Sequence, residues 1–333
     1  MSPGHAQAPA PRPHVVAVGG GHGLARLLGA LRRLPVERTA VVTAADDGGS
    51  SGRLRREHGI VPPGDARRAL LALAREERLA SLLAHRFGAG DLQGHALGNL
   101  VLLALAERRG GDVVAALDEA GTLLGCVGRV RPATRAPVRL CGQVGDEVLV
   151  GQAQLTSAGR RIGRVWLDPP APPACVAALE ALAHADLVVL GPGSLFTSVI
   201  ATLLVPAVAE AVAAAPRVAH VLNVSTQPGE TRSLSADEHL AALRAHVPGL
   251  VLDPVIVHDG PPAPPPAEPL GAEVRDPIAR TVRRADLLAR REDGSPGRVH
   301  DEGALAAVLA DVLGVARSER AARSARGQGT APG

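Results

Sequence analysis

The sequence predicts an α/β protein built around a mostly parallel β-sheet. Between residues 14 and 45, an apolar run, a glycine-rich turn, an amphipathic stretch and a second apolar run follow one another, which is the order of a βαβ unit. Later apolar runs, ending at Leu190 and Val224, are again followed by loops that contain glycine. The chain has 333 residues, 46% of them hydrophobic, so it is long enough to bury a sizeable core.

The elements of this fold can be placed in order along the chain. Short apolar runs predict the strands of the sheet, at residues 14–18, 39–45, 186–190, 217–224 and 250–257. Helical spacing predicts the helices, one from the first glycine turn to about residue 34, several within 65–120, and others at 175–185, 195–215, 236–246 and 302–315. Ser235 is a candidate N-cap for the helix at 236–246.

Four segments do not follow this pattern. Residues 126–167 alternate between apolar and polar side chains, with glycine breaks, and predict a small β-rich insertion of antiparallel strands. Residues 260–269 are rich in proline and predict a mobile loop. The composition of residues 1–13 and 317–333 predicts disordered tails, which leaves one α/β domain over residues 14–316.

The composition excludes several kinds of chemistry. All 36 basic residues are arginine and there is no tyrosine, which excludes a Schiff-base lysine, a Walker P-loop lysine and the Tyr–Lys pair of some reductases. The chain has three aromatic rings, Phe87, Trp166 and Phe196, too few to stack along a single-stranded nucleic acid. The net charge is +3 without a long run of arginines, so we expect no nucleic-acid partner.

The cysteines and apolar runs favour a cytoplasmic protein. Cys126, Cys141 and Cys175 show no CxxC spacing, as expected in a reducing compartment, and predict neither a disulfide framework nor a zinc ribbon. The first residues lack the character of a signal peptide, and the longest apolar stretch, 198–215, is interrupted by Pro206 and Glu210. We therefore expect no membrane insertion.

Two glycine-rich loops that follow predicted strands are candidates for an anion site. In a parallel sheet they share the edge formed by the carboxyl ends of the strands, where ligands bind. Glycine lets backbone N–H groups approach an anion, and the helix that follows adds a positive dipole end. We predict that a pyrophosphate lies between the two loops; the alternative is a pair of tight turns without a ligand. The candidate residues are Gly19, Gly20, Gly21, His22, Gly23, Gly191, Gly193 and Ser194.

Two further loops at the same edge carry polar side chains. In the first, one of two adjacent carboxylates is expected to accept a ligand hydroxyl or to bind a hydrated Mg²⁺, and the alternative is an N-cap and turn. The serines that follow are better explained as hydroxyl donors to a ligand than as nucleophiles, because no base lies beside them in the sequence. The candidates from both loops are Asp46, Asp47, Gly48, Gly49, Ser50, Ser51, Thr226, Gln227, Gly229 and Glu230.

These motifs occur in the order in which a known family carries them. The chain resembles the YvcK/CofD-like family from about residue 14 to residue 315 through the strings VVAVGGGHGLARLLGALRRLP, VVTAADDGGSSGRLRREHGIVPPGDARRALLALA, GHALGNL, DLVVLGPGSLFTSVIATLLVPAVAEA, LNVSTQPGET and SADEH. The resemblance is closer to the YvcK branch, the gluconeogenesis factors. Transferases of the CofD branch carry a different stretch where this chain has SSGRLRREHGIVPPGD.

The resemblance implies a three-layer α/β/α fold with a Rossmann-like sheet, often in a homodimer. For the YvcK branch it implies binding of a UDP-sugar such as UDP-N-acetylglucosamine, and regulation that links central carbon metabolism to cell shape and cell-wall synthesis, with no required cofactor. For the CofD branch it implies a transferase that moves a phospholactyl group from a guanylyl donor to a deazaflavin with Mg²⁺. The matched motifs add Arg53, Gly64, Asp65, Asn99, Thr197 and Asn223 to the ligand-binding candidates.

The chain departs from the YvcK pattern at four places. His22 stands where threonine is usual, and Ser225 stands where methionine is usual. Residues 232–234 replace a stretch that usually includes an aromatic, and Val299 separates an arginine from the histidine that usually follows it. Our first hypothesis is a nucleotide-sugar-binding regulatory protein with no established reaction, and the second is a CofD-like transferase, which a bound deazaflavin would distinguish. A dinucleotide-dependent oxidoreductase is the third, disfavoured because GxGxxG, tyrosine and lysine are missing.

Overall fold

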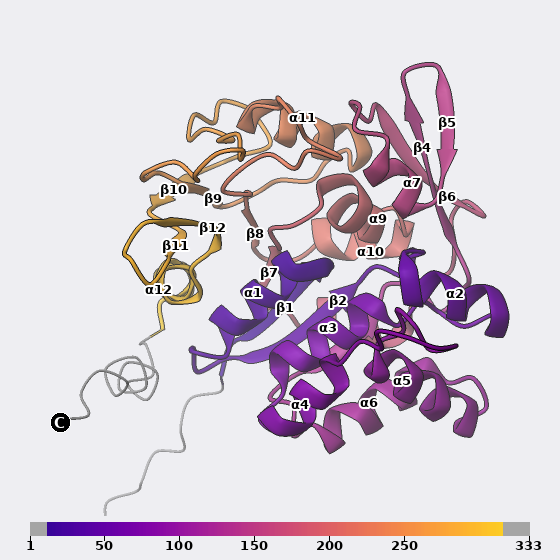
Figure 1. The fold of residues 1–333 in the computed structure, drawn as a ribbon. Coiled ribbons are helices and arrows are strands. Elements are labelled where there is room, and N and C mark those ends of the chain that lie inside the picture. The colour runs from indigo at the N-terminus through magenta and orange to yellow at the C-terminus, as the bar shows by residue number, and fades with distance from the viewer. Residues whose placement is uncertain (1–11, 316–333) are drawn as a thin grey trace, which may run out of the picture.

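The computed structural model describes residues 12–315, and its centre is a sheet of seven strands (Figure 1). The strands lie in the order β10-β9-β8-β7-β1-β2-β3, and each neighbouring pair runs parallel. Their bounds are β1 (His14–Gly19), β2 (Glu37–Val42), β3 (Arg129–Pro132), β7 (Leu187–Leu190), β8 (Val218–Val221), β9 (Val255–His258) and β10 (Val282–Ala285). The predicted tails lie outside the described residues, apart from Arg12 and Pro13.

Burial on both faces explains the continuous apolar runs of the central strands. Val15, Val16, Ala17 and Val18 of β1 have no exposed surface, and their side chains alternate between two hydrophobic cores, one on each face of the sheet. β7 is buried along its whole length in the same way. These two strands pair with each other and form the middle of the sheet.

Helices cover both faces, so the α/β fold with a Rossmann-like parallel sheet is confirmed (Figure 1). One face is covered by α1 (Gly21–Leu31), α3 (Gly64–Leu73), α5 (Leu97–Arg108), α6 (Val113–Leu123) and α12 (Glu302–Leu313). The other is covered by α8 (Val176–Ala183), the π-helical turn η1 (Leu195–Ile200), α9 (Ala201–Leu203), α10 (Pro206–Ala213) and α11 (Ala236–His246). Ser235 and Glu238 form a capping box at the start of α11.

The segment predicted to be β-rich divides between two sheets. β4 (Arg139–Val144), β5 (Glu147–Val150) and β6 (Arg164–Asp168) form an antiparallel sheet in the order β5-β4-β6, with α7 (Gln152–Ser157) packed on it. β3, at the start of the segment, instead pairs in parallel with β2 at the edge of the main sheet. Alternation along so short a strand predicts a half-buried face but does not identify its partner.

Other elements were not placed individually by sequence. α2 (Gly49–His58) begins inside the stretch expected to be a loop. α4 (Glu77–Ala84), which precedes α5, lies within the region 65–120 that was predicted to be helical. β11 (Leu288–Arg290) and β12 (Pro296–His300) form a separate two-stranded antiparallel sheet. Within residues 12–315 no single helix has the length and hydropathy of a membrane span, and the pair Leu195–Leu203 and Pro206–Ala213 meets these criteria jointly across a bend of 85°.

The strand order reverses direction between β1 and β7. From β1 the chain proceeds to β2 and β3 on one side, and it later returns to add β7, β8, β9 and β10 in succession on the other. Ligands of open parallel sheets bind outside the carboxyl ends of the strands at such a switch point. In this fold the switch point lies between the loop after β1, residues 19–23, and the loop after β7, residues 191–194.

Candidate functional site

The glycines of the loop after β1 (Gly19–Gly23, the β1 loop) let its backbone lie close to neighbouring groups. Gly20 is extended, and Gly21 has φ +64° and starts α1. A Cβ at Gly20 would lie 2.3 Å from Asp65 Oδ2, whereas a Cβ at Gly21 would meet nothing within 4 Å. The N–H of Gly21 donates to Asp65 Oδ1 at 3.0 Å, while those of His22 and Gly23, in the first turn of α1, have no acceptor within the helix.

The loop after β7 (Gly191–Ser194, the β7 loop) is in direct contact with the β1 loop. A Cβ at Gly23 would lie 2.0 Å from the carbonyl oxygen of Pro192 and 2.6 Å from the nitrogen of Gly193. The N–H of Gly191 donates to Val18 O at 2.9 Å, and Gly193 adopts φ +128°. The two loops are therefore packed directly against each other, and a ligand has to lie beside their contact.

Most of the N–H donors of the β7 loop are already used within the protein. Asn223 holds Gly193 on both sides, accepting from its N–H at 2.7 Å and donating to its carbonyl at 2.8 Å. The carboxylate of Glu230 accepts from the N–H groups of Phe196 and Thr197, at 3.1 and 3.3 Å, and from the hydroxyl of Thr197. Glu230 is 2% exposed and burial raises its pKa. It occupies the place at the start of η1 where an anion would otherwise bind.

A cavity of about 620 Å³, the switch cavity, opens beside the contact between the two loops. Of the predicted residues, His22, Gly23, Gly193, Asn223 and Gln227 line it. Four arginines, which sequence reasoning did not identify, line it as well: Arg26, Arg32, Arg68 and Arg298.

The ion pairs around the switch cavity leave it positively charged. Arg26 pairs with Glu302 at 3.3 Å, and Arg68 pairs with Asp65 at 2.7 Å. Glu302 is the one carboxylate among the lining residues. Burial, followed by the charges of Arg68, Arg67 and Arg26, lowers the pKa of His22. An anion here would meet several guanidinium groups, which match phosphate geometry well.

Three of the four departures from the YvcK pattern lie at the switch cavity, and residues 232–234 do not line it. His22 lines it from the β1 loop, Ser225 from the loop after β8, and Val299 from β12. His300, next to Val299, is buried and its Nε2 lies 3.0 Å from Leu222 O. These three departures therefore change the lining of one cavity and leave the contact between the two loops intact.

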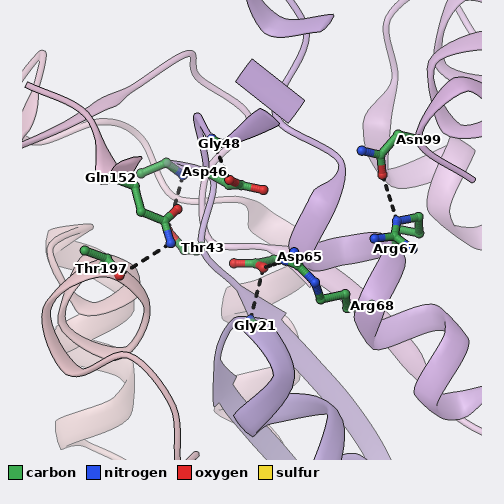
Figure 2. A network of polar contacts seen from close by, with 11 residues as sticks. Gly21, Thr43, Asp46, Gly48, Asp65, Arg67, Arg68, Asn99, Gln152 and Thr197 are labelled. Atoms are coloured by element: carbon green, nitrogen blue, oxygen red, sulfur yellow. Dashed lines mark hydrogen bonds and ion pairs between the residues drawn. The ribbon is translucent and has the colours of Figure 1, made fainter. Parts of the chain in front are cut away.

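On the other side of the β1 loop, Asp46 and Asp65 form an acid pair (Figure 2). Asp65 is 3% exposed, and its Oδ2 has no hydrogen-bond partner. Burial, followed by the charge of Asp46, raises the pKa of Asp65 to about 6, against the opposing effect of Arg68. Asp46 Oδ1 accepts from the N–H of Gly48 at 3.0 Å, and the missing Cβ of Gly64 leaves room for Asp46 Oδ2 and the Ser51 hydroxyl.

The acid pair fits a divalent cation. Mg²⁺ is commonly held by one or two carboxylates together with water and substrate phosphates, and an orphaned buried carboxylate oxygen is the ligand such an ion requires. Asp47, the other predicted carboxylate, has structural contacts instead. Its Oδ1 accepts from the N–H of Ala153 at 2.9 Å in the first turn of α7.

Ser50 and Asn99 meet in a buried polar network behind the acid pair (Figure 2 shows its Arg67–Asn99 contact). Ser50 Oγ accepts from Asn99 Nδ2 at 3.0 Å and lies 3.1 Å from His95 Nδ1. Asn99 Oδ1 accepts from Arg67 Nε at 2.9 Å, and burial, followed by the charge of Arg68, lowers the pKa of Arg67 to about 10. This network fixes α2, α3 and α5 against one another.

The remaining predicted residues have other neighbours. Arg53 donates to the carbonyl of Gln93, and Thr226 donates to Glu268 Oε2 at 3.2 Å. Gly49 starts α2 with φ +45°, and a Cβ at Gly229 would lie 2.2 Å from Thr156 O in α7. These positions shape the loops and are set back from the switch cavity.

Comparisons with known proteins agree with the fold and the motifs. Residues 15–286 match the family model described as 2-phospho-L-lactate transferase CofD. The chain is 45% identical over 312 residues to a Mycobacterium tuberculosis protein named "Putative gluconeogenesis factor", covering 89% of each chain. It is 43% identical over 251 residues to the gluconeogenesis factor of Bacillus subtilis, covering 74% of this chain and 79% of that one.

A solved structure shows the same architecture. The crystal structure of a UPF0052-family protein from Bacillus halodurans superposes with a TM-score of 0.81 at 36% sequence identity, covering 90% of this chain and 98% of the other. The residues that match the CofD family model include the β1 loop, the acid pair and the β7 loop, because all of them lie within residues 15–286. The chain therefore belongs to the CofD family, among the YvcK-like gluconeogenesis factors.

Proposed function

We propose that this protein is a nucleotide-sugar-binding regulatory protein, and that the diphosphate of a UDP-sugar lies in the switch cavity. The observation that carries the proposal is the position of an arginine-lined cavity at the point where the strand order reverses. Parallel sheets bind nucleotides at this place, and the lining of this cavity favours an anion.

The donors around the cavity are sufficient for a diphosphate. The N–H groups of His22 and Gly23 lie at the positive end of α1, and Arg26, Arg68 and Arg298 line the same space. Each charge-assisted hydrogen bond contributes about 1.5–3 kcal/mol. Four or five of them contribute about 6–15 kcal/mol, a range that includes the ~8 kcal/mol of a micromolar complex before ordering costs are subtracted. This differs from our sequence prediction, because arginine side chains replace the donors of the β7 loop.

The polar lining suits the sugar and the base. Gln227 lines the cavity, and its buried Oε1 has no hydrogen-bond partner among residues 12–315. A hydroxyl of a sugar, or the N–H of an acetamido group or a uracil ring, would satisfy this acceptor. None of Phe87, Trp166 and Phe196 lines the cavity, so hydrogen bonds, together with the histidine and arginine side chains of the lining, would hold the base.

The name of the relatives, gluconeogenesis factor, supports a regulatory role in central carbon metabolism. As part of the proposal, the sugar nucleotide reports on that metabolism and the protein transmits the signal to cell shape and cell-wall synthesis. We place this action in the cytoplasm, in a homodimer, through a protein partner and without nucleic acid or membrane insertion.

Titration calorimetry at fixed ionic strength tests the proposal with UDP-N-acetylglucosamine, GDP and NAD as ligands. We expect saturable micromolar binding of the UDP-sugar, and at least tenfold weaker binding in the Arg26→Ala/Arg298→Ala variant. Arg78→Ala/Arg108→Ala is the matched control, because it removes two exposed arginines from α4 and α5, away from the cavity. Absence of UDP-sugar binding to the wild type, or an equal loss in the control, would show that the proposal is wrong.

The acid pair favours a second function, that of a CofD-like transferase with a guanylyl donor and a deazaflavin acceptor. Mg²⁺ held by Asp46 and Asp65 would neutralise charge on the donor phosphates. Asp65 Oδ2 would supply one ligand, while Arg68 orients the other oxygen of that carboxylate. Incubation with a guanylyl-phospholactate donor, deazaflavin and Mg²⁺ tests this function, and product formed by the wild type but not by Asp65→Asn would establish it.

A further inference from the structure

At the opposite edge of the sheet, the amino ends of β1, β2 and β3 enclose a second cavity of about 890 Å³, the amino-edge cavity. β1 is six residues long, so the two edges are about 20 Å apart. Five arginines line the amino-edge cavity: Arg12, Arg38, Arg75, Arg129 and Arg131. None of them belongs to the switch cavity.

The charges in the amino-edge cavity are poorly compensated. Arg131 pairs with Asp118 at 2.7 Å, but the other four arginines form no ion pair with a carboxylate of residues 12–315. Glu37 and Glu180 are the two acidic residues of the lining. Once Asp118 has neutralised Arg131, the four other arginines and the two glutamates leave an excess of two positive charges. A phosphate monoester, which carries about −1.5 to −2 near neutral pH, would compensate this excess.

Arg38 is the most unusual member of this lining. It is 9% exposed, and its Nε has no hydrogen-bond partner. Its Nη2 donates to the carbonyls of Leu34 and Val36, at 3.1 and 2.5 Å, so the guanidinium is held in a fixed position. Burial, followed by the positive charges of Arg12, Arg32 and Arg75, lowers its pKa.

The sequence makes room for this buried arginine. A Cβ at Gly128 would lie 2.5 Å from Arg38 Cγ, so glycine at that position lets the arginine stem lie across the start of β3. A buried cation without a counter-charge is costly. An anion in the cavity would supply the missing counter-charge.

Polar groups beside the arginines complete the lining. His14, Thr39 and His184 lie on the side of the cavity next to α8. His14 Nε2 lies 3.0 Å from the Thr39 hydroxyl, and His184 Nδ1 lies 2.8 Å from Glu180 O, so these side chains are ordered before any ligand arrives. Arginine forks and hydroxyl groups together are typical of phosphate recognition.

We propose that the amino-edge cavity is a second ligand site, which binds a phosphorylated small molecule independently of the switch cavity. The volume is within the range of small-molecule sites, roughly 300–1,000 Å³. Arg38 and Arg75 approach the phosphate from one side of the sheet edge, and Arg129 approaches it from the other. A ligand here would bridge β1, β2 and β3, the strands that support the acid pair at their other end.

Titration with inorganic phosphate, against chloride of equal ionic strength, tests this site by calorimetry and thermal shift. Arg75→Ala/Arg129→Ala removes two exposed arginines from the cavity and leaves the buried Arg38 in place, so we expect the variant to fold. It should bind phosphate at least tenfold more weakly than the wild type at this site. Arg26→Ala/Arg298→Ala, in the switch cavity, should keep the amino-edge binding.

Matched controls separate this site from general electrostatic attraction. Arg78→Ala/Arg108→Ala lowers the net charge equally and should bind phosphate like the wild type. The proposal is overturned if the wild type shows no saturable phosphate binding, if Arg75→Ala/Arg129→Ala binds as tightly as the wild type, or if the charge control loses as much affinity. Because inorganic phosphate would also meet the arginines of the switch cavity, the Arg75→Ala/Arg129→Ala comparison is repeated in the Arg26→Ala/Arg298→Ala background, where failure of the proposed function leaves these outcomes unchanged.

Discussion

Replacing Gly23 with alanine tests whether contact between the β1 and β7 loops builds the switch cavity. Gly23 is helical, in the first turn of α1, so alanine would gain about 1 kcal/mol from helix propensity alone. The new Cβ, however, would lie 2.0 Å from Pro192 O and 2.6 Å from Gly193 N, and both are backbone atoms. The loops would have to separate by roughly 1.4 Å for the contact of 2.0 Å to reach ordinary van der Waals distance.

Separation of the two loops is resisted because the Asn223 side chain holds the backbone of Gly193 with hydrogen bonds of 2.7 and 2.8 Å. Overpacking of this kind costs about 1–3 kcal/mol or more and exceeds the gain in propensity. We expect Gly23→Ala to lower the free energy of unfolding in urea by about 1–2 kcal/mol, and UDP-sugar affinity in calorimetry at least tenfold.

Gly121→Ala is the matched control for this change. Gly121 is also helical, in α6, and a Cβ there would lie 3.7 Å from the nearest side-chain atom, which is ordinary contact. We expect it to raise the free energy of unfolding by about 0.5–1 kcal/mol. If Gly23→Ala also stabilises the protein and binds the UDP-sugar normally, the contact between the loops does not shape the site.

Burial, followed by the charge of Asp46, raises the pKa of Asp65, and Asp46→Asn removes that second cause. The melting temperature should therefore stay or rise while stabilisation by added Mg²⁺ falls; a lower melting temperature with an unchanged Mg²⁺ effect would contradict this. His220 and His239 have pKa values lowered by burial to about 4 and about 3. Their unfolded pKa is about 6.5, so the stability they contribute is complete above that pH and is lost as the pH falls below it. The pKa of the buried His300 is likewise lowered to about 4, so urea unfolding at pH 5.5 should give a free energy about 3 kcal/mol lower than at pH 7.5, after Asp65, with its raised pKa, offsets part of the loss. A bound anion should raise the lowered pKa of His22, so calorimetry in buffers of different ionisation enthalpy should show proton uptake on binding near pH 6.5, and His22→Ala should abolish it.

The sheet was predictable from sequence because its strands are buried on both faces. A continuous apolar run ending in glycine has few other interpretations, and β1 and β7 were placed correctly for that reason. The pairing of β7 with β1 was not predictable, since it joins residues more than 170 positions apart. The switch point therefore became visible only in the structure, although both of its loops were identified.

The side chains of the site were harder to predict than its loops. Arg26 and Arg68 lie on helices, where the apolar spacing predicts the buried face but not what the polar face meets. Arg298 comes from β12, far along the chain. Glu230 was identified as a ligand residue, yet it binds the start of η1, 34 positions earlier in the sequence. No local pattern distinguishes a carboxylate that faces a ligand from one that holds a loop.

Arg68 links the two halves of the candidate site. It pairs with Asp65 at 2.7 Å and also lines the switch cavity, while Asp65 accepts from Gly21 in the β1 loop. An anion in the cavity that recruits Arg68 would take the counter-charge away from Asp65, and a cation at the acid pair would restore it. The affinities for an anionic ligand and for a divalent cation should therefore rise together, because each ligand reduces the cost that the other imposes on the same buried carboxylate.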